Sequence, residues 1–458
     1  MRSAVSWFER LGRTRQILAI AGAAALVVLL AAAAWLVGVP GAMDFADGRK
    51  VALADYPGAD PTGVPAALAG AGLVERGEYL ARAADCVVCH TGPGGVPYAG
   101  GFAFTLPFGT IYSTNITPDE ETGIGQYTDA QFLAAVQRGV GRHGEGLYPA
   151  MPYTSYGYMT DADILAIKAY LLTLEPVRAP SPEARLAFPF NQRWLMHVWS
   201  AMFAPHKGFM PNAEKSAEWN RGAYLAEALA HCGECHTPRN LVFAIDNRAK
   251  FKGAVAAGWR AYNITQDRKT GIGDWSEADL LSYLSTGHAP GRGTASGPMG
   301  EAIDESFSLL APEDRRALVA YVRSVPAKSS ALPASLAPAA PASHRLGAET
   351  ADALGKTLFE GACVSCHAWT GEGTLSPLAT LTGARAVNDP SAINVVQAIV
   401  SGDHRAAAGG IISMPAFGGA YSDTEIAALA NYVTARFGAA PSRVTEKDVA
   451  SLRRQAGG

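Results

Sequence analysis

Three copies of one cysteine-and-histidine pattern constrain this chain more than any other feature of its sequence. Each copy is a Cys-x-x-Cys-His pentad, and the three pentads contain all six cysteines of the chain: Cys86, Cys89 and His90; Cys232, Cys235 and His236; Cys363, Cys366 and His367. A histidine directly after the second cysteine is typical of covalent c-type haem attachment. Zinc, disulfides and redox dithiols are the alternatives, but no further cysteine completes a metal site at the usual spacing. The pattern therefore predicts three covalently bound haem c groups.

The iron of such a haem is bound from one face by the pentad histidine, here His90, His236 and His367. The opposite ligand decides the chemistry, because a methionine closes the iron to substrate and raises its reduction potential. Three methionines stand beside prolines at corresponding places after the pentads: Met151, Met299 and Met414. We expect them to lie in loops and to be the sixth ligands of the three irons.

Histidines compete with these methionines for the sixth position. Each methionine is preceded by one of them: His143, His288 and His404. Bis-histidine ligation is therefore the alternative, and Met159 is a weaker competitor of Met151. A single methionine usually fills the core, but recurrence at the same place in all three units favours methionine ligation.

The sequence contains internal repeats. The Asn-Ile-Thr triplet at 115–117 recurs at 263–265, and Thr-Gly-Ile-Gly at 122–125 recurs at 270–273, both 148 residues later. A constant offset across separate motifs indicates homologous domains, and 458 residues suffice for about three. The predicted division is an N-terminus with a membrane anchor (1–50), a first unit (51–180), an aromatic and methionine-rich connector (181–215), a second unit (216–327), an Ala/Pro linker (328–346), a third unit (347–438) and a tail (439–458).

Each unit is expected to be all-helical, with no convincing alternating strands. Helices are predicted before the pentads (75–84, 219–230, 352–361), in the middle of the units (129–140, 277–286, 392–400) and at their ends (161–174, 312–325, 423–437). Tyrosines at matching places in the end helices, Tyr170, Tyr321 and Tyr432, are expected to pack against the first helices. Asn115 and Asn263 are expected either to form turns or to bind haem propionates.

The N-terminus carries one uncharged apolar run at 17–39, preceded by Arg2, Arg10, Arg13 and Arg15. Its length suffices to cross a bilayer, and positive charge before it predicts a cytoplasmic N-terminus and a periplasmic body. A cleaved signal peptide is the alternative, although its apolar core is usually only about 7–15 residues. The connector segment 188–212 is expected to present one helix face made of Trp194, Leu195, Trp199, Met202 and Phe203. This face either packs between the first two units or contacts a partner or the membrane surface. The tail segment 444–454 is expected to be a short amphipathic helix. The net charge of −3 favours no nucleic-acid partner.

Several longer stretches carry a family resemblance: ERGEYLARAADCVVCHT, PFGTIYSTNITPDEETGIG, LYPAMPYTSY, WNRGAYLAEALAHCGECHTPRN, TGHAP, SGPM and MPAFGGAYSDTEIAALANYV. With them the chain resembles the trihaem cytochrome c subunit of bacterial membrane-bound dehydrogenases, which oxidise alcohols, aldehydes, gluconate, sorbitol or fructose. The resemblance implies three tandem class I cytochrome c-like domains behind the N-terminal transmembrane helix.

The resemblance also implies a role at the bacterial inner membrane. A periplasmic catalytic subunit with flavin, pyrroloquinoline quinone or molybdenum, with or without a small subunit, would supply electrons that this chain passes to ubiquinone. Several relatives are held by a C-terminal segment, whereas the apolar run here is N-terminal. Two other functions remain open, a haem enzyme such as a peroxidase with one open iron, and a free periplasmic electron shuttle.

Overall fold

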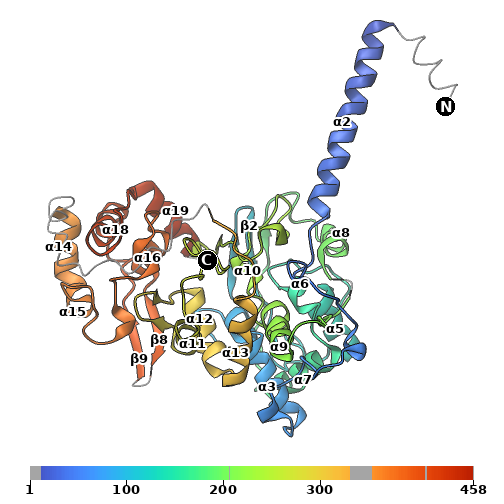
Figure 1. The fold of residues 1–458 in the computed structure, drawn as a ribbon, viewed down its shortest axis with the longest axis horizontal. Coiled ribbons are helices and arrows are strands. Elements are labelled where there is room, and N and C mark those ends of the chain that lie inside the picture. Colours follow the sequence, from blue (N-terminus) through green and yellow to red (C-terminus); the bar gives the residue numbers. More distant parts are fainter. Residues whose placement is uncertain (1–11, 206, 331–352, 408–409, 457–458) are drawn as a thin grey trace.

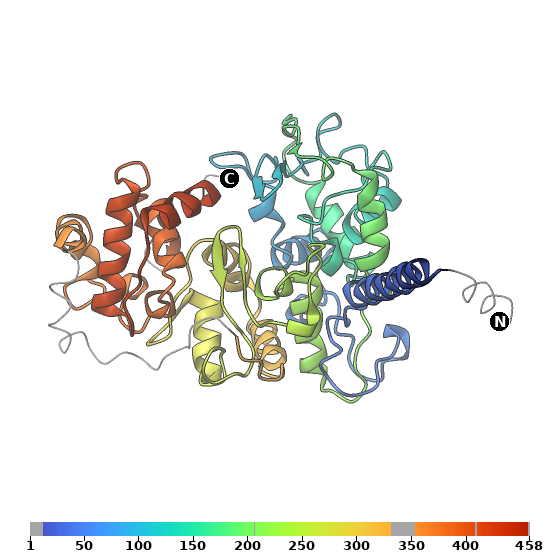
Figure 2. The same ribbon diagram turned by 90° about the horizontal axis from the view of Figure 1, so that it is seen from above.

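The computed structural model describes residues 12–205, 207–330, 353–407 and 410–456, and in these ranges the chain is mostly helical. The helix α2 (Arg13–Val37) projects from a body of shorter helices (Figure 1). Elements from α14 (Ala353–Ala362) to α19 (Glu446–Ala456) gather at the end of the body away from α2. The second unit lies between the first and the third in both views (Figure 2).

The elements have the following bounds. The other helices are α3 (Leu73–Ala83), α4 (Cys86–Cys89), α5 (Asp129–Arg138), α6 (Tyr153–Tyr156), α7 (Asp161–Leu171), α8 (Trp194–Phe203), α9 (Ala217–Tyr224), α10 (Gly233–His236), α11 (Glu277–Thr286), α12 (Pro298–Glu305), α13 (Pro312–Val322), α15 (Val364–His367), α16 (Arg385–Asn388), α17 (Ile393–Ser401) and α18 (Asp423–Phe437). The strands are β1 (Ala103–Leu106), β2 (Gly109–Tyr112), β3 (Arg185–Leu186), β4 (Ala254–Ala256), β5 (Trp259–Ala261), β6 (His288–Ala289), β7 (Gly293–Thr294), β8 (Asp403–Ala407) and β9 (Gly410–Met414). Single turns are η1 (Leu53–Asp55), η2 (Ala66–Leu68), η3 (Leu225–Leu229), η4 (Asn247–Ala249), η5 (Phe307–Leu309) and η8 (Pro377–Ala379).

One helix crossing occurs three times, between the first and the last helix of each unit: α3 with α7, α9 with α13, and α14 with α18. A glycine stands at each crossing, where an added Cβ would lie 1.9 Å from the Ala166 carbonyl oxygen at Gly77, 1.9 Å from that of Ala317 at Gly222, and 2.3 Å from that of Ala428 at Gly355. The expected tyrosines lie at these same crossings, with Tyr321 and Tyr432 almost fully buried. The helices approach this closely because glycine has no side chain.

Between the helix crossing and the following pentad, the second unit has one more residue than the first. Cys86 follows Tyr79 by seven residues, whereas Cys232 follows the equivalent Tyr224 by eight. A π-helical turn, η3, absorbs the difference, and the Ala230 N–H reaches back to the Leu225 carbonyl at 2.7 Å. Such single-turn bulges accommodate an extra residue inside a helix. The predicted uniform helix over 219–230 is therefore α9 followed by η3.

The hydrophobic side chains form two large cores. The first combines side chains of the first and second units, from Leu80 and Ile164 to Leu225 and Leu318. The second contains side chains of the third unit, including Phe359 and Phe437, together with Val449 of α19. The first two units are therefore packed as one body, and the expected tail helix is part of the core of the third unit.

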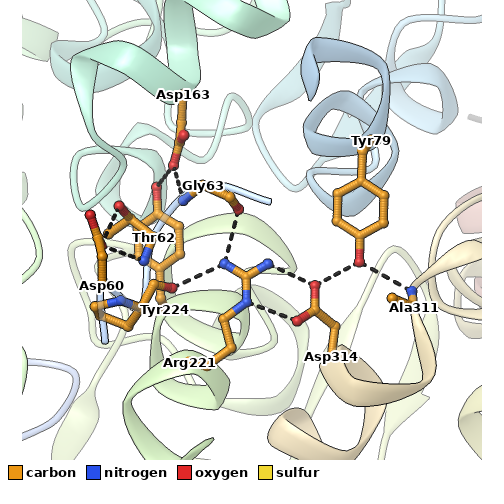
Figure 3. A network of polar contacts seen from close by, with 10 residues as sticks. Asp60, Thr62, Gly63, Tyr79, Asp163, Arg221, Tyr224, Ala311 and Asp314 are labelled. Atoms are coloured by element: carbon orange, nitrogen blue, oxygen red, sulfur yellow. Dashed lines mark hydrogen bonds and ion pairs between the residues drawn. The ribbon is translucent and has the colours of Figure 1, made fainter. Parts of the chain in front are cut away.

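A polar network joins the first two units (Figure 3). Arg221 binds both carboxylate oxygens of Asp314 and donates to the carbonyls of Pro61 and Gly63. The Gly63 N–H donates to Asp163 at 2.9 Å. Arg221 and Asp314 both belong to the second unit and are largely buried, so their ion pair is screened little by water. It holds the guanidinium where it donates to the two carbonyls of the first unit.

Short antiparallel hairpins depart from the all-helical expectation. The sheets are β1-β2-β3, β4-β5, β6-β7 and β8-β9. Glycines with positive φ stand at the turn of two hairpins, Gly109 and Gly410, a conformation in which glycine is not strained. Sequence periodicity does not indicate these strands, because they are only two to five residues long and their side chains show little alternation between buried and exposed.

Helix ends are closest to expectation where side chains cap them. Both α11 and α18 have the predicted bounds, and Ser276 with Asp279 and Ser422 with Glu425 form capping boxes. Within the described residues, α2 contains one stretch, Gln16–Leu36, that is long and apolar enough to cross a membrane. The connector forms α8 and the tail forms α19 as predicted, whereas 331–346 of the expected linker lies outside the described residues.

Candidate functional site

Each pentad forms a short helical turn directly after a first helix: α4 after α3, α10 after η3, and α15 after α14. In such a turn, residues three apart lie on one side, so the two thiols of a pentad are neighbours. Burial raises the pKa of the Cys86 and Cys232 thiols to about 12 and that of Cys363 to about 11. A reactive redox cysteine has a lowered pKa, so these thiols do not resemble one.

The three pentad histidines are oriented in the same way. Each ring Nδ1 contacts a backbone carbonyl oxygen: His90 that of Thr114 at 2.7 Å, His236 that of Tyr262 at 2.6 Å, and His367 that of Ala379 at 2.6 Å. A carbonyl only accepts hydrogen bonds, so Nδ1 carries the proton and Nε2 keeps its lone pair. Burial lowers the pKa of all three rings, which favours this neutral form. A neutral imidazole fixed through Nδ1 is prepared to bind a metal through Nε2.

The repeated asparagine loops hold two of these carbonyls. Asn115 accepts from the Thr117 N–H at 2.9 Å and donates to Thr122 and Val177. Asn263 makes the same three kinds of contact in the second unit. Their side chains are thus used to fix the loops that carry Thr114 and Tyr262. Of the two expected roles, these contacts favour turn formation over binding of haem propionates.

The three methionines do not all lie in loops. Met151 precedes α6 in a loop as expected, but Met299 is in the first turn of α12 and Met414 ends β9. Pro298 explains the helix, because its fixed φ suits the first helical turn. All three side chains are partly buried and pack against the hydrophobic cores.

The hairpin of the third unit separates Met414 from its competitor His404. Met414 pairs with Asp403, and His404 pairs with Ser413. Because side chains alternate across a strand, Met414 and His404 point to opposite faces. Met414 packs against the core, whereas His404 is exposed and its Nδ1 lies 2.8 Å from Ser413 Oγ.

The remaining competitors have other surroundings. His143 is exposed, and Nδ1 of His288 lies 3.0 Å from Thr294 Oγ1. Met159 is only 2% exposed and lies within the large shared core. His143 is therefore a surface residue, His288 stabilises its hairpin, and Met159 fills the core.

Known proteins are similar to this chain over most of its length. The cytochrome c family model matches residues 74–175 and 353–436. The cytochrome subunit of fructose dehydrogenase from Gluconobacter japonicus is 40% identical over 416 residues, which cover 86% of this chain and 85% of that subunit. The chain belongs to the family of cytochrome c subunits of dehydrogenases. The cytochrome c subunit of Pantoea cypripedii gluconate 2-dehydrogenase is 37% identical, over 83% of this chain and 90% of the relative. That of Gluconacetobacter polyoxogenes quinone-dependent alcohol dehydrogenase is 34% identical, over 84% and 85%.

As a family member, this cytochrome subunit is an electron-transfer protein with covalently bound haem c, rather than the catalytic subunit of a dehydrogenase. Its first two pentads approach each other through α6. Thr154 and Ser155 donate to Glu234, which stands inside the second pentad, at 2.8 and 3.2 Å. Tyr156 donates to the carbonyl of Ala84, two residues before the first pentad, at 2.6 Å. The acidic residue inside CGECH is the sequence signal that could have indicated this contact.

A buried ion pair next to the second pentad of the cytochrome subunit was not expected from the sequence. Lys250 and Glu227 are nearly inaccessible and lie 2.5 Å apart, and Tyr321 donates to the other oxygen of Glu227 at 2.6 Å. The charge on Glu227 also contributes to the raised pKa of Cys232, after burial. No signal in the sequence identified Glu227, because Arg82 is the equivalent residue of the first unit.

Proposed function

We propose that this cytochrome subunit carries three haem c groups, one on each pentad, and relays electrons from a dehydrogenase catalytic subunit to ubiquinone. The observation that carries the proposal is the threefold hydrogen bond from a pentad histidine to a backbone carbonyl. It occurs in each of three tandem units that share one helix crossing, whereas the family model matches two regions. A ring held through Nδ1 presents Nε2 to a metal ion, so recurrence of the contact in all three units supports three bound irons.

The donor set of each unit fits a haem c. Two neighbouring thiols are available for thioether bonds, and the proposed iron ligands are Nε2 of the pentad histidine and the sulfur of Met151, Met299 or Met414. A bound haem c supplies an iron that alternates between its ferrous and ferric forms. The chain holds both ligands on packed elements, so little rearrangement of the protein needs to accompany a change of iron charge.

Methionine ligation in all three units separates an electron carrier from a haem enzyme. An iron with two protein ligands has no position for peroxide or oxygen, whereas an open iron would. Packing of Met414 on the core face of its hairpin, with His404 exposed on the other face, supports methionine over bis-histidine ligation in the third unit.

We further propose that α2 anchors the subunit in the bacterial inner membrane, with the body on the periplasmic side. Its apolar stretch of 21 residues matches a hydrocarbon core about 30 Å thick. The catalytic partner would oxidise a substrate such as fructose, gluconate or an alcohol, as the names of the relatives suggest. It would use flavin, pyrroloquinoline quinone or molybdenum, with or without a small subunit.

Purified protein tests the proposal directly. The pyridine haemochrome assay should find three haems per chain, and magnetic circular dichroism of the ferric protein should contain a sulfur-to-iron band for each. Fewer than three haems would overturn the haem count, and carbon monoxide binding to one native haem would support the haem enzyme instead. Recovery of the protein from cells without detergent would favour the free shuttle.

A further inference from the structure

We propose that α8 and a neighbouring loop form a surface that lies in the membrane–water interface beside the end of α2. We call it the α8 surface and define it by six exposed apolar side chains: Phe188, Trp194, Val198, Met202, Leu241 and Phe243. Its proposed occupant is the lipid of the interfacial region. The inference rests on the proposed anchoring by α2.

The helix α8 has an exposed apolar stripe. Trp194, Val198 and Met202 are four residues apart and are 62%, 49% and 41% exposed. Residues at this spacing lie on one helix face. The face toward the body is also apolar, since Trp199 is only 8% exposed. A helix that is apolar on its outer face as well has an unfavourable contact with water, which burial in another apolar medium removes.

A loop of the second unit extends this stripe. Trp199 Nε1 donates to the Val242 carbonyl at 2.7 Å, which ties the loop to α8. Phe108 stacks on Phe190 with ring centres 3.9 Å apart and meets Phe243 edge-on at 5.1 Å. Leu241, two residues before Phe243, is 85% exposed. The exposed apolar residues of α8 and of the loop are therefore held next to one another.

The same loop holds the end of α2, which determines what covers the surface. Asn240 donates to the Leu36 carbonyl at 3.3 Å, and Asn247 donates to the Pro40 carbonyl at 3.0 Å. Arg248 donates to the Trp35 carbonyl at 2.8 Å, with its guanidinium 3.7 Å above the Trp35 ring. Figure 1 shows α8 beside the point where α2 meets the body. If α2 crosses the bilayer, its last turn lies at the bilayer surface, and so do the loop and α8.

The residue types match an interfacial position. Tryptophan is enriched where a membrane meets water, and Trp35 and Trp194 are both more than half exposed. Within α8 there is no Asp, Glu, Lys or Arg, while Arg193 and Lys207 are exposed on either side of it. Basic residues that flank an apolar helix can reach lipid phosphates.

Other exposed apolar residues do not share this arrangement. Leu375 and Ile411 of the third unit are 78% and 79% exposed, as strongly as Phe188 and Leu241. Both belong to the third unit, whose labelled elements gather at the end of the body away from α2 (Figure 1). Scattered exposed apolar residues are normal in soluble proteins, so Leu375 and Ile411 serve as matched controls.

The inner side of the α8 surface touches the first haem-binding unit. Trp199 meets Tyr153 edge-on at 6.0 Å, and Met151 packs against the cluster that they form with Ala244. The proposed lipid contact therefore lies one layer of side chains away from the proposed iron ligand Met151. The first two units, rather than the third, would then be held against the bilayer.

Photolabelling of the full-length holoprotein in phosphatidylcholine–phosphatidylglycerol nanodiscs tests the inference. A phospholipid with an aryl-diazirine close to its headgroup is activated by light, and labelled peptides are mapped by mass spectrometry. We expect label in α2 and in peptides containing 188–203 and 241–243, and only background in peptides containing Leu375 or Ile411. In the variant Val198→Glu/Met202→Glu, labelling of α8 should fall to background, whereas Leu375→Glu/Ile411→Glu should leave it unchanged.

The possible results separate the proposals. Label in α2 with only background in α8 and 241–243 overturns the α8 surface and leaves the anchor standing, and would favour a protein partner on that face. Label in neither overturns both anchor and surface. Label in α8 without label in α2 supports a surface-bound subunit. All of these results leave the haem count and electron transfer to be judged by the haemochrome assay. Wild-type labelling decides the question even if a charged variant fails to fold.

Discussion

The Tyr79 hydroxyl donates a 2.6 Å hydrogen bond to Asp314, and the equivalent Tyr224 returns the contact by donating to Asp163 at 2.5 Å. Each tyrosine is on the first helix of one unit, and each aspartate is on the last helix of the other (Figure 3). Backbone N–H groups at equivalent positions, those of Ala311 and Thr160, also donate to the two hydroxyls. The first two units are therefore joined by two equivalent contacts: in each, a tyrosine of one unit donates to an aspartate of the other.

The two halves of this contact should differ in strength. Asp314 is also bound twice by Arg221, whereas Asp163 receives its other hydrogen bond from Gly63. We expect Tyr224→Phe to lower the free energy of unfolding by about 1.5–3 kcal/mol, because a buried carboxylate loses a donor. Tyr79→Phe should cost less. Urea unfolding of both variants measures the difference, and an equal or larger loss in Tyr79→Phe would contradict the argument.

The glycine at the third helix crossing has a matched control in the same helix. At Gly355 an added Cβ would lie 2.3 Å from the Ala428 carbonyl oxygen, while at Gly361 nothing lies within 4 Å. We expect Gly355→Ala to destabilise the third unit by about 1–3 kcal/mol or more, since backbone must move. Gly361→Ala should be neutral or stabilising by up to about 1 kcal/mol, because alanine favours helix. Thermal unfolding followed by circular dichroism would detect both effects.

Met414 and His404 offer a second matched pair, on opposite faces of one hairpin. Met414→Ala should lower the reduction potential of one haem and remove one sulfur-to-iron band, while the haem content stays unchanged. His404→Ala should change neither the haem reduction potentials nor the magnetic circular dichroism spectrum. Redox titration with magnetic circular dichroism makes the comparison. Loss of haem in Met414→Ala would mean that this residue is needed first for folding.

Asp85 should make stability depend on pH. Burial, reinforced by the charges of Glu301 and Glu305, raises its pKa to about 7 from an ordinary 3.8. The folded chain then keeps a proton that the unfolded chain has lost, so stability should fall as the pH rises from about 4 to about 7. Asp85→Asn removes the charge and also suits the left-handed φ of 55°. Its stabilising effect should be larger at about pH 8 than at about pH 5, and equal effects would argue against the raised pKa.

Arg385 brings a positive charge from the third unit to the second. Its guanidinium donates to the Asn263 and Thr270 carbonyls and lies 4.5 Å above the Tyr262 ring. Besides burial, this charge lowers the pKa of His236. Because a nearby positive charge favours the ferrous form, Arg385→Met should lower one reduction potential, and Arg385→Lys should lower it less. Spectroelectrochemical titration tests this, and equal shifts in both variants would indicate a packing effect instead.

Local chemistry made the helices and the pentads predictable. Ser422 and Glu425 specify where α18 begins, because capping involves residues three apart in the chain. The hairpins were not predictable, since β8 and β9 present no clear alternation and Met414 was expected in a loop. The η3 bulge follows from counting one inserted residue, but its place within the helix does not.

The sequence by itself determined which residues we propose to attach the haems and where the main helices lie, because both depend on patterns of a few neighbouring residues. Only the tertiary structure decided that Tyr79 meets Asp314, that Met414 faces the core while His404 faces solvent, and that α8 lies beside the end of α2. These relationships depend on how each element packs against parts of the chain that are distant in sequence, such as Tyr79 and Asp314, 235 positions apart, rather than on local preference.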